Sequence, residues 1–572
     1  MKEKLFMIKK TALSSLLVLS LFLSGCSNVQ YTEIEKSSKT VLNNTNFDNL
    51  ENAEEETVQN QINAIYNTSY SSKVKENLDE LKSESDYDET KPLIVHNPFG
   101  TNTCSLYVYF KSAKAYKTSY TIHAEGYSDY TNTLEASTKK EHEFQLIGLI
   151  PDTNNQITLT MTDAKGKEVT YSFEYNFGSL LGDEKVQLSQ TSRSQLLTTD
   201  TTQLSDGLYA ILGNDSEDLD FMYYYDSNGI LRGEVPIRGY RSHRLLFENN
   251  LMYYSISAYK IAAVNALGQV EQVISTQDYQ LHHDYCFDQD GNLLVLGSKE
   301  IEGDYDNSRS EDLILKINPS TNSIVATLDL GDVFSNYKKQ TSIPESDKNS
   351  EGVYGLDWMH INSIQCLDDN SLILSSRETS TIIKLSNVFD DTKIDYLIGE
   401  ESFWQDTKYA NKLLDKVGDF ANATGQHSVT YEEDDSLEKG QYYLYLFNNN
   451  FGASQTNPTY DWSQIVGTNT KNNFYMTKDE VANAHSYYYK YLVDEKNGTY
   501  QLVKSFEVPY SSHVSSVQDI GSNIVVDSGF QGIFGEYDQD GNLLREFKIK
   551  RNDYMIYRVY KYSFDKFYFN KA

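Results

Sequence analysis

The chain has 572 residues, and its 82 Asp and Glu against 50 Lys and Arg give a formal charge of −32 at pH 7. This charge argues against nucleic acids and anionic lipid surfaces as partners, because electrostatic attraction drives binding to both. The chain is too long for one hydrophobic core, and 45 Tyr with only 8 Pro favour strands, so we expect a strand-rich protein with more than one domain.

Residues 1–25 have the order of a lipoprotein signal peptide. Four lysines precede an apolar run that is too short to span a bilayer comfortably, and small residues follow up to Cys26. The stretch Leu23-Ser24-Gly25-Cys26 resembles a lipobox, which implies cleavage before Cys26 and acylation of that cysteine. We therefore predict a protein anchored by lipid at the extracytoplasmic face of the cell membrane, with no other contact to the membrane.

Three cysteines remain after this processing: Cys104, Cys286 and Cys366. Their sparse, odd number cannot form the disulfide framework that stabilises many exported proteins. We expect the fold to rest on its hydrophobic core, with Cys286 and Cys366 as buried thiols.

Two regions of different character follow the signal. Residues 26–90 are polar and acidic, and apolar residues at helical spacing near 54–81 predict a tether with one or two helices. Over residues 91–180 the pattern changes to short alternating segments such as "CSLYVYFKSA" and "QITLTMTDA", parted by Gly, Asn and Asp turns. This size and strand count predict a small N-terminal β-sandwich.

The remaining region, residues 186–572, contains internal repeats. The segment that starts at His282 aligns with the one at His360 at a shift of 78 residues without a gap, and further copies start at His427 and His513. The repeats are spaced by 67 to 86 residues, room for about four strands each, and two upstream segments of similar pattern bring the number to six. We therefore predict an all-β chain: a six-bladed β-propeller preceded by the small sandwich.

Four histidines open predicted blades. Because the inner strands of a propeller begin near its axis, His282, His360, His427 and His513 should converge on one site if their positions are equivalent. His283 should point to the opposite face of its strand, as a packing residue or a neighbour of the site. A single such histidine would more often be structural, whereas four in register favour a functional site.

Arg377 and Asn362 lie in the same stretch as His360. Converging histidines could bind zinc or copper, but a permanently charged guanidinium is a poor neighbour for a divalent cation, so we predict no metal. Imidazoles with a guanidinium and an amide are better suited to hold a tetrahedral oxyanion, and imidazole is itself a nucleophile. The pattern predicts covalent transfer of an anionic group.

Several of these motifs together resemble the bacterial arylsulfotransferases (aryl sulfate sulfotransferases). The matching stretches are "VHNPFGTN" at 95–102, "HHD" at 282–284, "GLDWMHINSI" at 355–364, "SSR" at 375–377 and "ATGQHSV" at 423–429. The resemblance extends over roughly residues 91 to 565. It implies a sandwich followed by a propeller, and it allows a homodimer formed through the N-terminal domains.

The resemblance implies transfer of a sulfuryl group from an aryl sulfate to a phenol without a cofactor. His427 would attack sulfur and become a sulfohistidine, and His360, Asn362, Arg377 and His282 would hold the sulfonate oxygens. His360 or His282 would protonate the leaving phenolate, and we expect His513 and His283 to contact the substrate. The sequence agrees in having no G-x-x-x-x-G-K-[ST] loop for a nucleotide donor.

Two other functions stay open at this point. A propeller on a lipid tether could bind a ligand without catalysis, although a scaffold would have little need for His and Arg at blade starts. An aryl sulfate hydrolase could use the same residues, because the choice between water and phenol as acceptor depends on how dry the pocket is.

Overall fold

The computed structural model describes residues 41–43, 55–182, 188–195, 203–213, 220–299, 309–310, 313–341, 356–549 and 555–570. The predicted signal peptide and Cys26 lie outside these ranges. Within them, no helix is long and apolar enough to cross a membrane.

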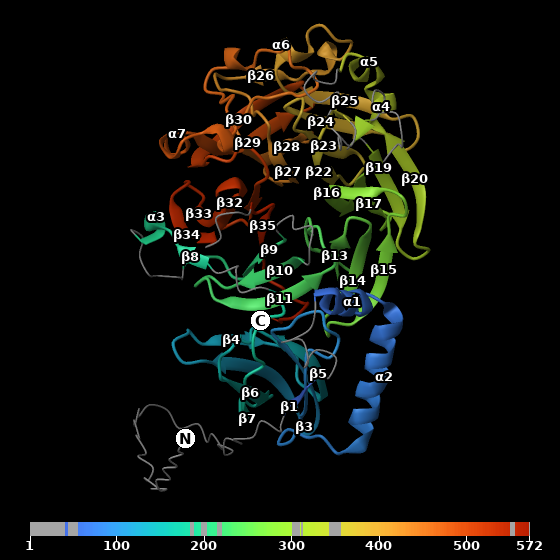
Figure 1. The fold of residues 1–572 in the computed structure, drawn as a ribbon, viewed down its shortest axis with the longest axis vertical. Helices are drawn as coiled ribbons and strands as arrows, with labels where there is room; N and C mark the ends of the chain where they lie inside the picture. The colour runs from blue at the N-terminus through green and yellow to red at the C-terminus, as the bar shows by residue number, and fades with distance from the viewer. Residues whose placement is uncertain are drawn as a thin grey trace, which may run out of the picture.

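Two helices precede β2, where the sequence suggested helical spacing, and the second runs three residues beyond the predicted stretch. They are α1 (Glu55–Ile65) and α2 (Thr68–Glu84). The Asn67 side chain caps α2 by accepting a hydrogen bond from the backbone N–H of Ser69 at 3.1 Å. Leu78 of α2 packs on a small cluster of sandwich residues, and α2 lies along one side of the molecule (Figure 1).

The N-terminal domain is built around one long strand, β3 (Ser105–His123). Its first half pairs with β2 (Leu93–His96) and β5 (Lys139–Ile147), and its second half pairs with β4 (Tyr130–Thr133) and β6 (Asn155–Asp163). β1 (Val41–Asn43) and β7 (Glu168–Tyr175) complete the two outer edges. The strand β3 therefore joins both groups of strands into one seven-stranded sheet.

The rest of the chain forms a propeller. Its described residues make four sheets of four strands and two of five, which is the number of sheets that the predicted blades require. The first combines β9 (Leu208–Ile211), β10 (Asp220–Tyr225) and β11 (Leu231–Ile237) with the C-terminal β35 (Val559–Tyr562). The last strand of the chain thus pairs with the first strand of the propeller and closes the ring (Figure 1).

The next three sheets are antiparallel and take their strands in chain order. The second contains β12 (Leu246–Glu248), β13 (Leu251–Ser257), β14 (Lys260–Asn265) and β15 (Val270–Ser275). The third contains β16 (Gln280–Phe287), β17 (Leu293–Ser298), β19 (Leu313–Asn318) and β20 (Ser323–Asp329). The fourth contains β22 (Ile361–Cys366), β23 (Leu372–Ser376), β24 (Thr381–Ser386) and β25 (Lys393–Ile398).

The last two sheets each gain a fifth strand. The fifth sheet has β27 (His427–Glu432), β28 (Gln441–Asn448), β29 (His485–Asp494), β30 (Thr499–Pro509) and the parallel β26 (Asp415–Val417). The sixth has β31 (Ser516–Asp519), β32 (Asn523–Ser528), β33 (Ile533–Asp538), β34 (Leu543–Ile549) and β8 (Leu188–Gln190). A separate pair joins β18 (Arg309–Ser310) to β21 (Leu356–Asp357).

Short helices fill the connections between these strands. They are α3 (Ser192–Gln195), α4 (Leu330–Val333), α5 (Ser335–Lys338), α6 (Glu401–Trp404), α7 (Lys478–Asn483) and the 3₁₀ turns η3 (Ala410–Lys412), η4 (Trp462–Gln464), η5 (Asn473–Tyr475) and η6 (Gly529–Gln531). The sheets and the N-terminal domain confirm the predicted all-β architecture.

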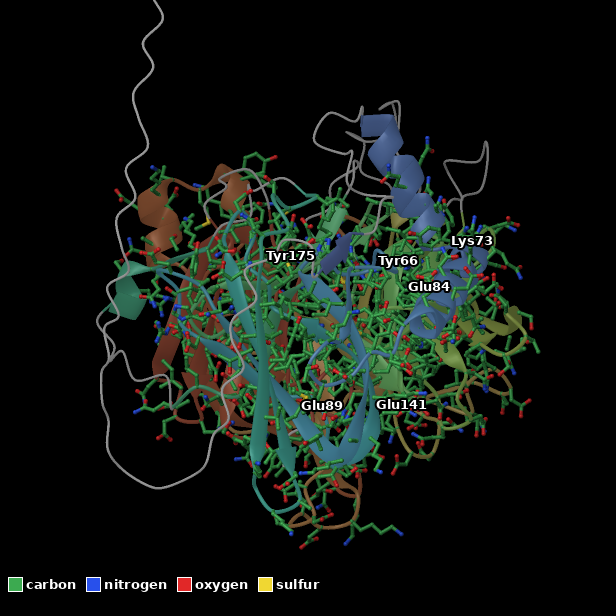
Figure 2. All side chains as sticks on the ribbon, turned by 90° about the horizontal axis from the view of Figure 1, so that it is seen from below. Tyr66, Lys73, Glu84, Glu89, Glu141 and Tyr175 are labelled. Carbon is green, nitrogen blue, oxygen red and sulfur yellow. The ribbon has the colours of Figure 1, made fainter. Side chains whose placement is uncertain are left out.

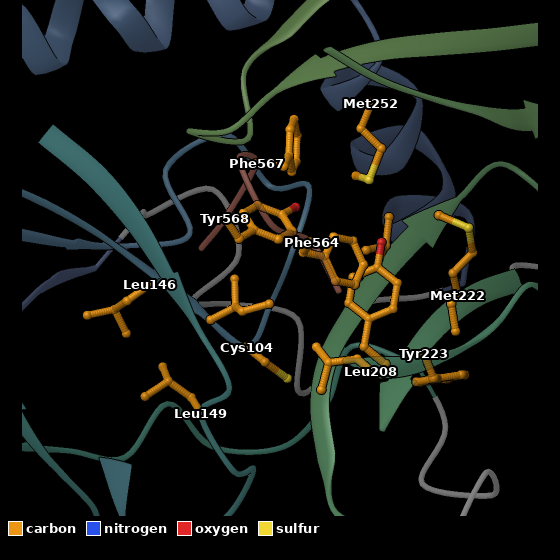
Figure 3. Packing of buried hydrophobic residues seen from close by; sticks show 14 of the residues in the cluster. Cys104, Leu146, Leu149, Leu208, Met222, Tyr223, Met252, Phe564, Phe567 and Tyr568 are labelled. Atoms are coloured by element: carbon orange, nitrogen blue, oxygen red, sulfur yellow. The ribbon is translucent and has the colours of Figure 1, made fainter. Parts of the chain in front are cut away.

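The sandwich and the propeller share one apolar core. Figure 3 shows Cys104 and Leu146 of the sandwich in the same cluster as Met222 of the propeller and Phe564 and Tyr568 of the C-terminal tail. The tail therefore lies between the two domains, and Figure 2 shows the sandwich strands in front of the propeller when the molecule is seen from that side. Cys104, Cys286 and Cys366 are free thiols.

Candidate active site

Four histidines lie in a row across the inner strands of the third, fourth and fifth sheets. The ring centroids of His282 and His283 are 5.1 Å apart, those of His283 and His360 are 4.6 Å apart, and those of His360 and His427 are 6.3 Å apart. His282, His283 and His427 are buried, whereas His360 is partly exposed. Three of the histidines that the sequence grouped by repeat position, His282, His360 and His427, therefore meet in one place, together with His283.

The hydrogen bonds of His427 determine which ring nitrogen carries the proton. Its Nδ1 lies 3.0 Å from the carbonyl oxygen of Gly425 and 2.8 Å from Oδ1 of Asn449. The Asn449 amide is oriented by its own Nδ2, which donates to the carbonyl oxygens of Ser511 and Val514 at 2.8 and 3.1 Å. Both neighbours of Nδ1 are acceptors, so Nδ1 bears the proton and Nε2 keeps a lone pair.

The surroundings of His427 also keep its ring neutral. Burial lowers the pKa of His427 well below its usual value, and positive charge on His360 and Arg377 acts in the same direction, against the opposing hydrogen bond of Asn449. An imidazole with a free Nε2 lone pair is the form that can act as a nucleophile.

Arg377 follows the end of β23 and is held from two sides. Its Nη1 donates to a carboxylate oxygen of Glu378 at 2.9 Å, and its Nη2 faces Nε2 of His513 at 3.4 Å. The second oxygen of Glu378 accepts from the backbone N–H of Thr456 at 2.7 Å and from the Ser454 hydroxyl at 3.1 Å. A guanidinium fixed in this way is preorganised to bind an oxyanion.

His513 lies beside Arg377 at the partly exposed edge of the site. A guanidinium can only donate, so Nε2 of His513 is the acceptor and its Nδ1–H donates to the hydroxyl of Ser512 at 2.8 Å. Burial, followed by the charge of Arg377, lowers the pKa of His513 to about 3. The ring is therefore neutral at physiological pH.

The two histidines considered as proton donors have different surroundings. Nδ1 of His360 contacts a carboxylate oxygen of Asp357, and a carboxylate in that position stabilises a protonated imidazolium. Burial lowers the pKa of His282 to about 3, although Asp357 opposes this shift. His360 is thus equipped to carry a proton and His282 is not.

Asn362 is completely buried and braces the segment before His427. Its Nδ2 donates to the carbonyl oxygen of Gln426 at 2.8 Å, while its Oδ1 has no hydrogen-bond partner among the described residues. Its own carbonyl oxygen accepts from Arg558 at 2.7 Å. The structure therefore gives Asn362 a supporting contact. Its predicted contact to a sulfonate oxygen, which requires the amide N–H as donor, stays a prediction.

The histidines do not hold equivalent repeat positions, and the expectation that they would is wrong. His427 is itself in the ladder, opposite Phe447, whereas His360 precedes the first paired residue of β22. The ladders of β16 and β22 contain bulges of different size, which the gapless alignment could not reveal.

The expectation that His283 points away from His282 is wrong for the same reason. His283 lies inside the β16 bulge with φ at +53°, and its Nδ1 is 3.0 Å from Nδ1 of His282. A left-handed residue interrupts the alternation of a strand, so both rings lie on one side.

Sequence reasoning missed Asn449, Asp357, Arg241 and His243. Asn449 is in an Asn-Asn-Asn run that ends a strand, and Asp357 is three residues before His360 in the same motif. Arg241 stacks on the ring of Tyr557, with 3.6 Å between the guanidinium carbon and the ring centroid. The three arginines and the histidine of "RGYRSHR" at 238–244 were a signal for this second basic cluster.

Metal ligands are a separate question. Over the ranges given above, no group of three or more His, Cys, Asp or Glu side chains is arranged to hold a metal ion.

Comparison with known proteins gives one extensive match. The family model "Arylsulfotransferase (ASST)" matches residues 193–568, and "Arylsulfotransferase Ig-like domain" matches residues 93–177. No curated protein matches the chain.

Solved structures give only distant similarity. A protein of unknown function from Bacteroides caccae is 10% identical, with 62% of this chain and 98% of that chain covered and a TM-score of 0.35. The WD40 domain of Toxoplasma gondii coronin is 10% identical (64% and 76% covered, TM-score 0.30), and virginiamycin B lyase from Staphylococcus aureus is 11% identical (64% and 89% covered, TM-score 0.28). At these scores the similarities carry no argument.

Proposed function

The chain belongs to the arylsulfotransferase family, and from this we propose that it transfers a sulfuryl group from an aryl sulfate to a phenol through a covalent adduct on His427. The observation that carries the proposal is the pair of acceptors at Nδ1 of His427, which leaves the Nε2 lone pair for attack. The nearby guanidinium of Arg377 supports the same chemistry, because it can bind the negative oxygens of a sulfuryl group.

In the first half-reaction Nε2 attacks sulfur and an N–S bond forms. The S–O bond to the aryl group breaks, and its electron pair goes to the leaving phenolate oxygen. A proton from His360, stabilised on that ring by Asp357, then neutralises the phenolate. Arg377 binds the sulfuryl oxygens while charge moves across them.

In the second half-reaction an acceptor phenol attacks the same sulfur. Its oxygen forms the new S–O bond, the N–S bond breaks, and the electron pair returns to Nε2 of His427. His360, now neutral, accepts the proton of the phenol and is restored to its starting form. The atoms and electrons balance in both steps without a redox or nucleotide cofactor.

Hydrolysis is the second candidate, since water could replace phenol in the second step. Binding without catalysis is a weaker candidate, because recognition of an anion would use the guanidinium of Arg377 but has no need of a nucleophile with a fixed proton. The lipid anchor at Cys26, the extracytoplasmic location and a homodimer remain parts of the proposal that require their own tests.

The direct test is release of 4-nitrophenol from 4-nitrophenyl sulfate, with and without added phenol. We expect release to depend on phenol and to be lost in His427→Ala. His485→Ala is the matched control, because the side chain of His485 is 42% exposed and lies at the start of β29, outside the histidine row. Release at the same rate without phenol would favour a hydrolase, and release by His427→Ala would refute the nucleophile.

A further inference from the structure

A row of aromatic rings leads from Arg377 to the protein surface. The guanidinium carbon of Arg377 is 5.8 Å from the ring centroid of Phe451, and the Phe451 centroid is 5.3 Å from that of His513. The row continues to Phe530 at 6.2 Å and from Phe530 to Phe474 at 4.6 Å, with the last two rings edge to face at 81°. We call Phe451, His513, Phe530 and Phe474 the aromatic path.

Exposure rises along the aromatic path. Phe451 is 5% exposed, His513 and Phe530 are half-buried, and Phe474 is 70% exposed. Two parts of the propeller supply the rings. The segment between β28 and β29 contributes Phe451 and Phe474, whereas His513 precedes β31 and Phe530 lies in η6 between β32 and β33. The path is therefore a feature of tertiary structure and cannot be found as a motif.

The outer ring is held in place although it is exposed. The backbone N–H of Phe474 donates to Oδ1 of Asn472 at 2.9 Å. The neighbouring Asn473 accepts from the backbone N–H of Ser512 at 2.7 Å and donates to the carbonyl oxygen of Tyr510 at 3.3 Å. These bonds tie the loop that carries Phe474 to the segment that carries His513.

Rings fixed at intervals beside an anion site form a surface for an aromatic ligand. Stacked and edge-to-face pairs favour ring centroids 4.5–7 Å apart, which is the range of spacings found here. The protein carries a formal charge of −32, so long-range electrostatics oppose the approach of an aryl sulfate anion. Uncharged aromatic contacts can supply the affinity that net charge does not.

We propose that the aromatic path binds the aryl group of the substrate and selects extended, two-ring aryl sulfates and phenols over single-ring ones. This inference rests on the proposed function, since it places the sulfuryl group at Arg377 and His427. A single ring reaches Phe451 and His513, and a second fused ring continues toward Phe530. Phe530 and Phe474 are thus specificity residues that contact the outer part of the aryl group.

The test measures the Kd of naphthalene-2-sulfonate by calorimetry on the full chain. The sulfur of this ligand is bonded to carbon, so the ligand binds without transferring its sulfuryl group. We expect Phe530→Ala to raise Kd about tenfold and Phe474→Ala about threefold, in line with the loss of aromatic contacts. Binding of benzenesulfonate should be affected less, and competition by inorganic sulfate should not change, because sulfate has no aryl group to contact the aromatic path. Thermal unfolding of each variant shows whether it is folded.

Tyr475→Ala is the matched control. Tyr475 adjoins Phe474 and is 76% exposed, but it has no ring contact to the aromatic path within the described residues. Its variant should bind naphthalene-2-sulfonate like the wild type. Three results would each overturn the inference. They are an equal loss of affinity in Tyr475→Ala and Phe474→Ala, an unchanged Kd in folded Phe530→Ala, and no binding of naphthalene-2-sulfonate by the wild type.

The outcome is separable from that of the proposed function. Binding that depends on Phe530 in a protein without transferase activity would leave the aromatic path standing and refute the transfer. Transfer with a KM for naphthyl sulfate that is the same in wild type and Phe530→Ala would leave the transferase standing and refute the aromatic path.

Discussion

Asn449 determines how His427 is presented for attack, although it does not reach the reacting atoms. Its Oδ1 accepts the Nδ1 proton at 2.8 Å, and its Nδ2 is fixed by two carbonyl oxygens. It is a positioning residue of the kind whose loss typically costs about 10–100-fold in activity.

We expect Asn449→Ala to lower kcat about 10–100-fold with little change in KM. Asn449→Asp keeps an acceptor and adds a negative charge, so it should raise the pKa of His427 and move the acid limb of the pH–rate profile to higher pH. The measurement is kcat against pH for both variants. A purely structural role for Asn449 would leave the pH profile of the aspartate variant in place.

The buried position of His427 makes a prediction about pH. Its pKa is lowered by burial and by His360 and Arg377, so the ring stays neutral as pH falls through 6.5, the ordinary histidine value. We expect kcat/KM for an aryl sulfate to show no loss centred at 6.5 and to fall only at lower pH. A half-maximal loss at 6.5 in a protein that remains folded would contradict the assigned environment.

The histidine row was predictable from the sequence, but the residue that orients His427 by a hydrogen bond, Asn449, was not. Repeated segments identified His282, His360 and His427, because each histidine lies near the start of a blade's inner strand, although their positions in the ladders differ. Asn449 is separated from His427 by a full hairpin of irregular length, so no spacing rule connects them. Its role follows from hydrogen-bond geometry, which a sequence does not contain.

At the scale of elements, irregular backbone at the starts of the inner strands brings the side chains of the site together. His283, His360, Ser428 and Val514 have φ between +49° and +59°. This left-handed conformation is unusual for residues other than glycine and rare for a β-branched one such as Val514. It interrupts strand alternation and lets neighbouring side chains reach the same site, so the period-two pattern that predicted the strands correctly gave the wrong side for His283.

Arg558, 1% exposed, joins four sheets at their inner edges. It precedes β35 and donates to the carbonyl oxygens of His243 and Asn362 and to the carboxylate of Asp284. Removing one partner of a buried ion pair typically costs about 3–5 kcal/mol. We expect Arg558→Met to lower the free energy of unfolding by this amount in chemical denaturation.

The control for that measurement is Lys73→Met on the exposed side of α2, which should unfold like the wild type. An Arg558→Met protein within about 1 kcal/mol of the wild type would mean that this ion pair does not hold the sheets together.

The sandwich and the propeller act as one body at the scale of the whole molecule. The sequence predicted two domains from their different strand patterns, and the match to the arylsulfotransferase family confirms the resemblance on which the functional reading rested. The sequence did not predict that the C-terminal tail packs between the sandwich and the propeller. The aromatic residues near Phe564 and Tyr568 do not recur at the spacing of a strand or a helix.

Glu234 of β11 lies at this junction and accepts hydrogen bonds from the Thr103 hydroxyl of the sandwich and from the backbone of Leu181 and Gly182. Burial raises the pKa of Glu234 to about 7 from 4.5. The folded protein then holds a proton that the unfolded chain has lost between these values, so this group's contribution to stability decreases as pH rises from 4.5 to 7.

Glu234→Gln removes the titrating carboxyl. We therefore expect the free energy of unfolding of this variant, relative to that of the wild type, to rise by roughly 3 kcal/mol between pH 4.5 and pH 7. Thermal unfolding of both proteins at several pH values measures it, with Glu248→Gln on an exposed strand end as the control. A constant difference between Glu234→Gln and wild type from pH 4.5 to 7 would show that the junction carboxyl has an ordinary pKa.

The central claim is that His427 carries the sulfuryl group, and mass spectrometry of the protein mixed with 4-nitrophenyl sulfate in the absence of phenol tests it most directly. The account predicts one SO₃ group bound through nitrogen on the peptide that contains His427, formed together with one equivalent of nitrophenol and lost when phenol is added. Phenol-dependent transfer with no modified histidine, or modification of a different residue, would contradict it.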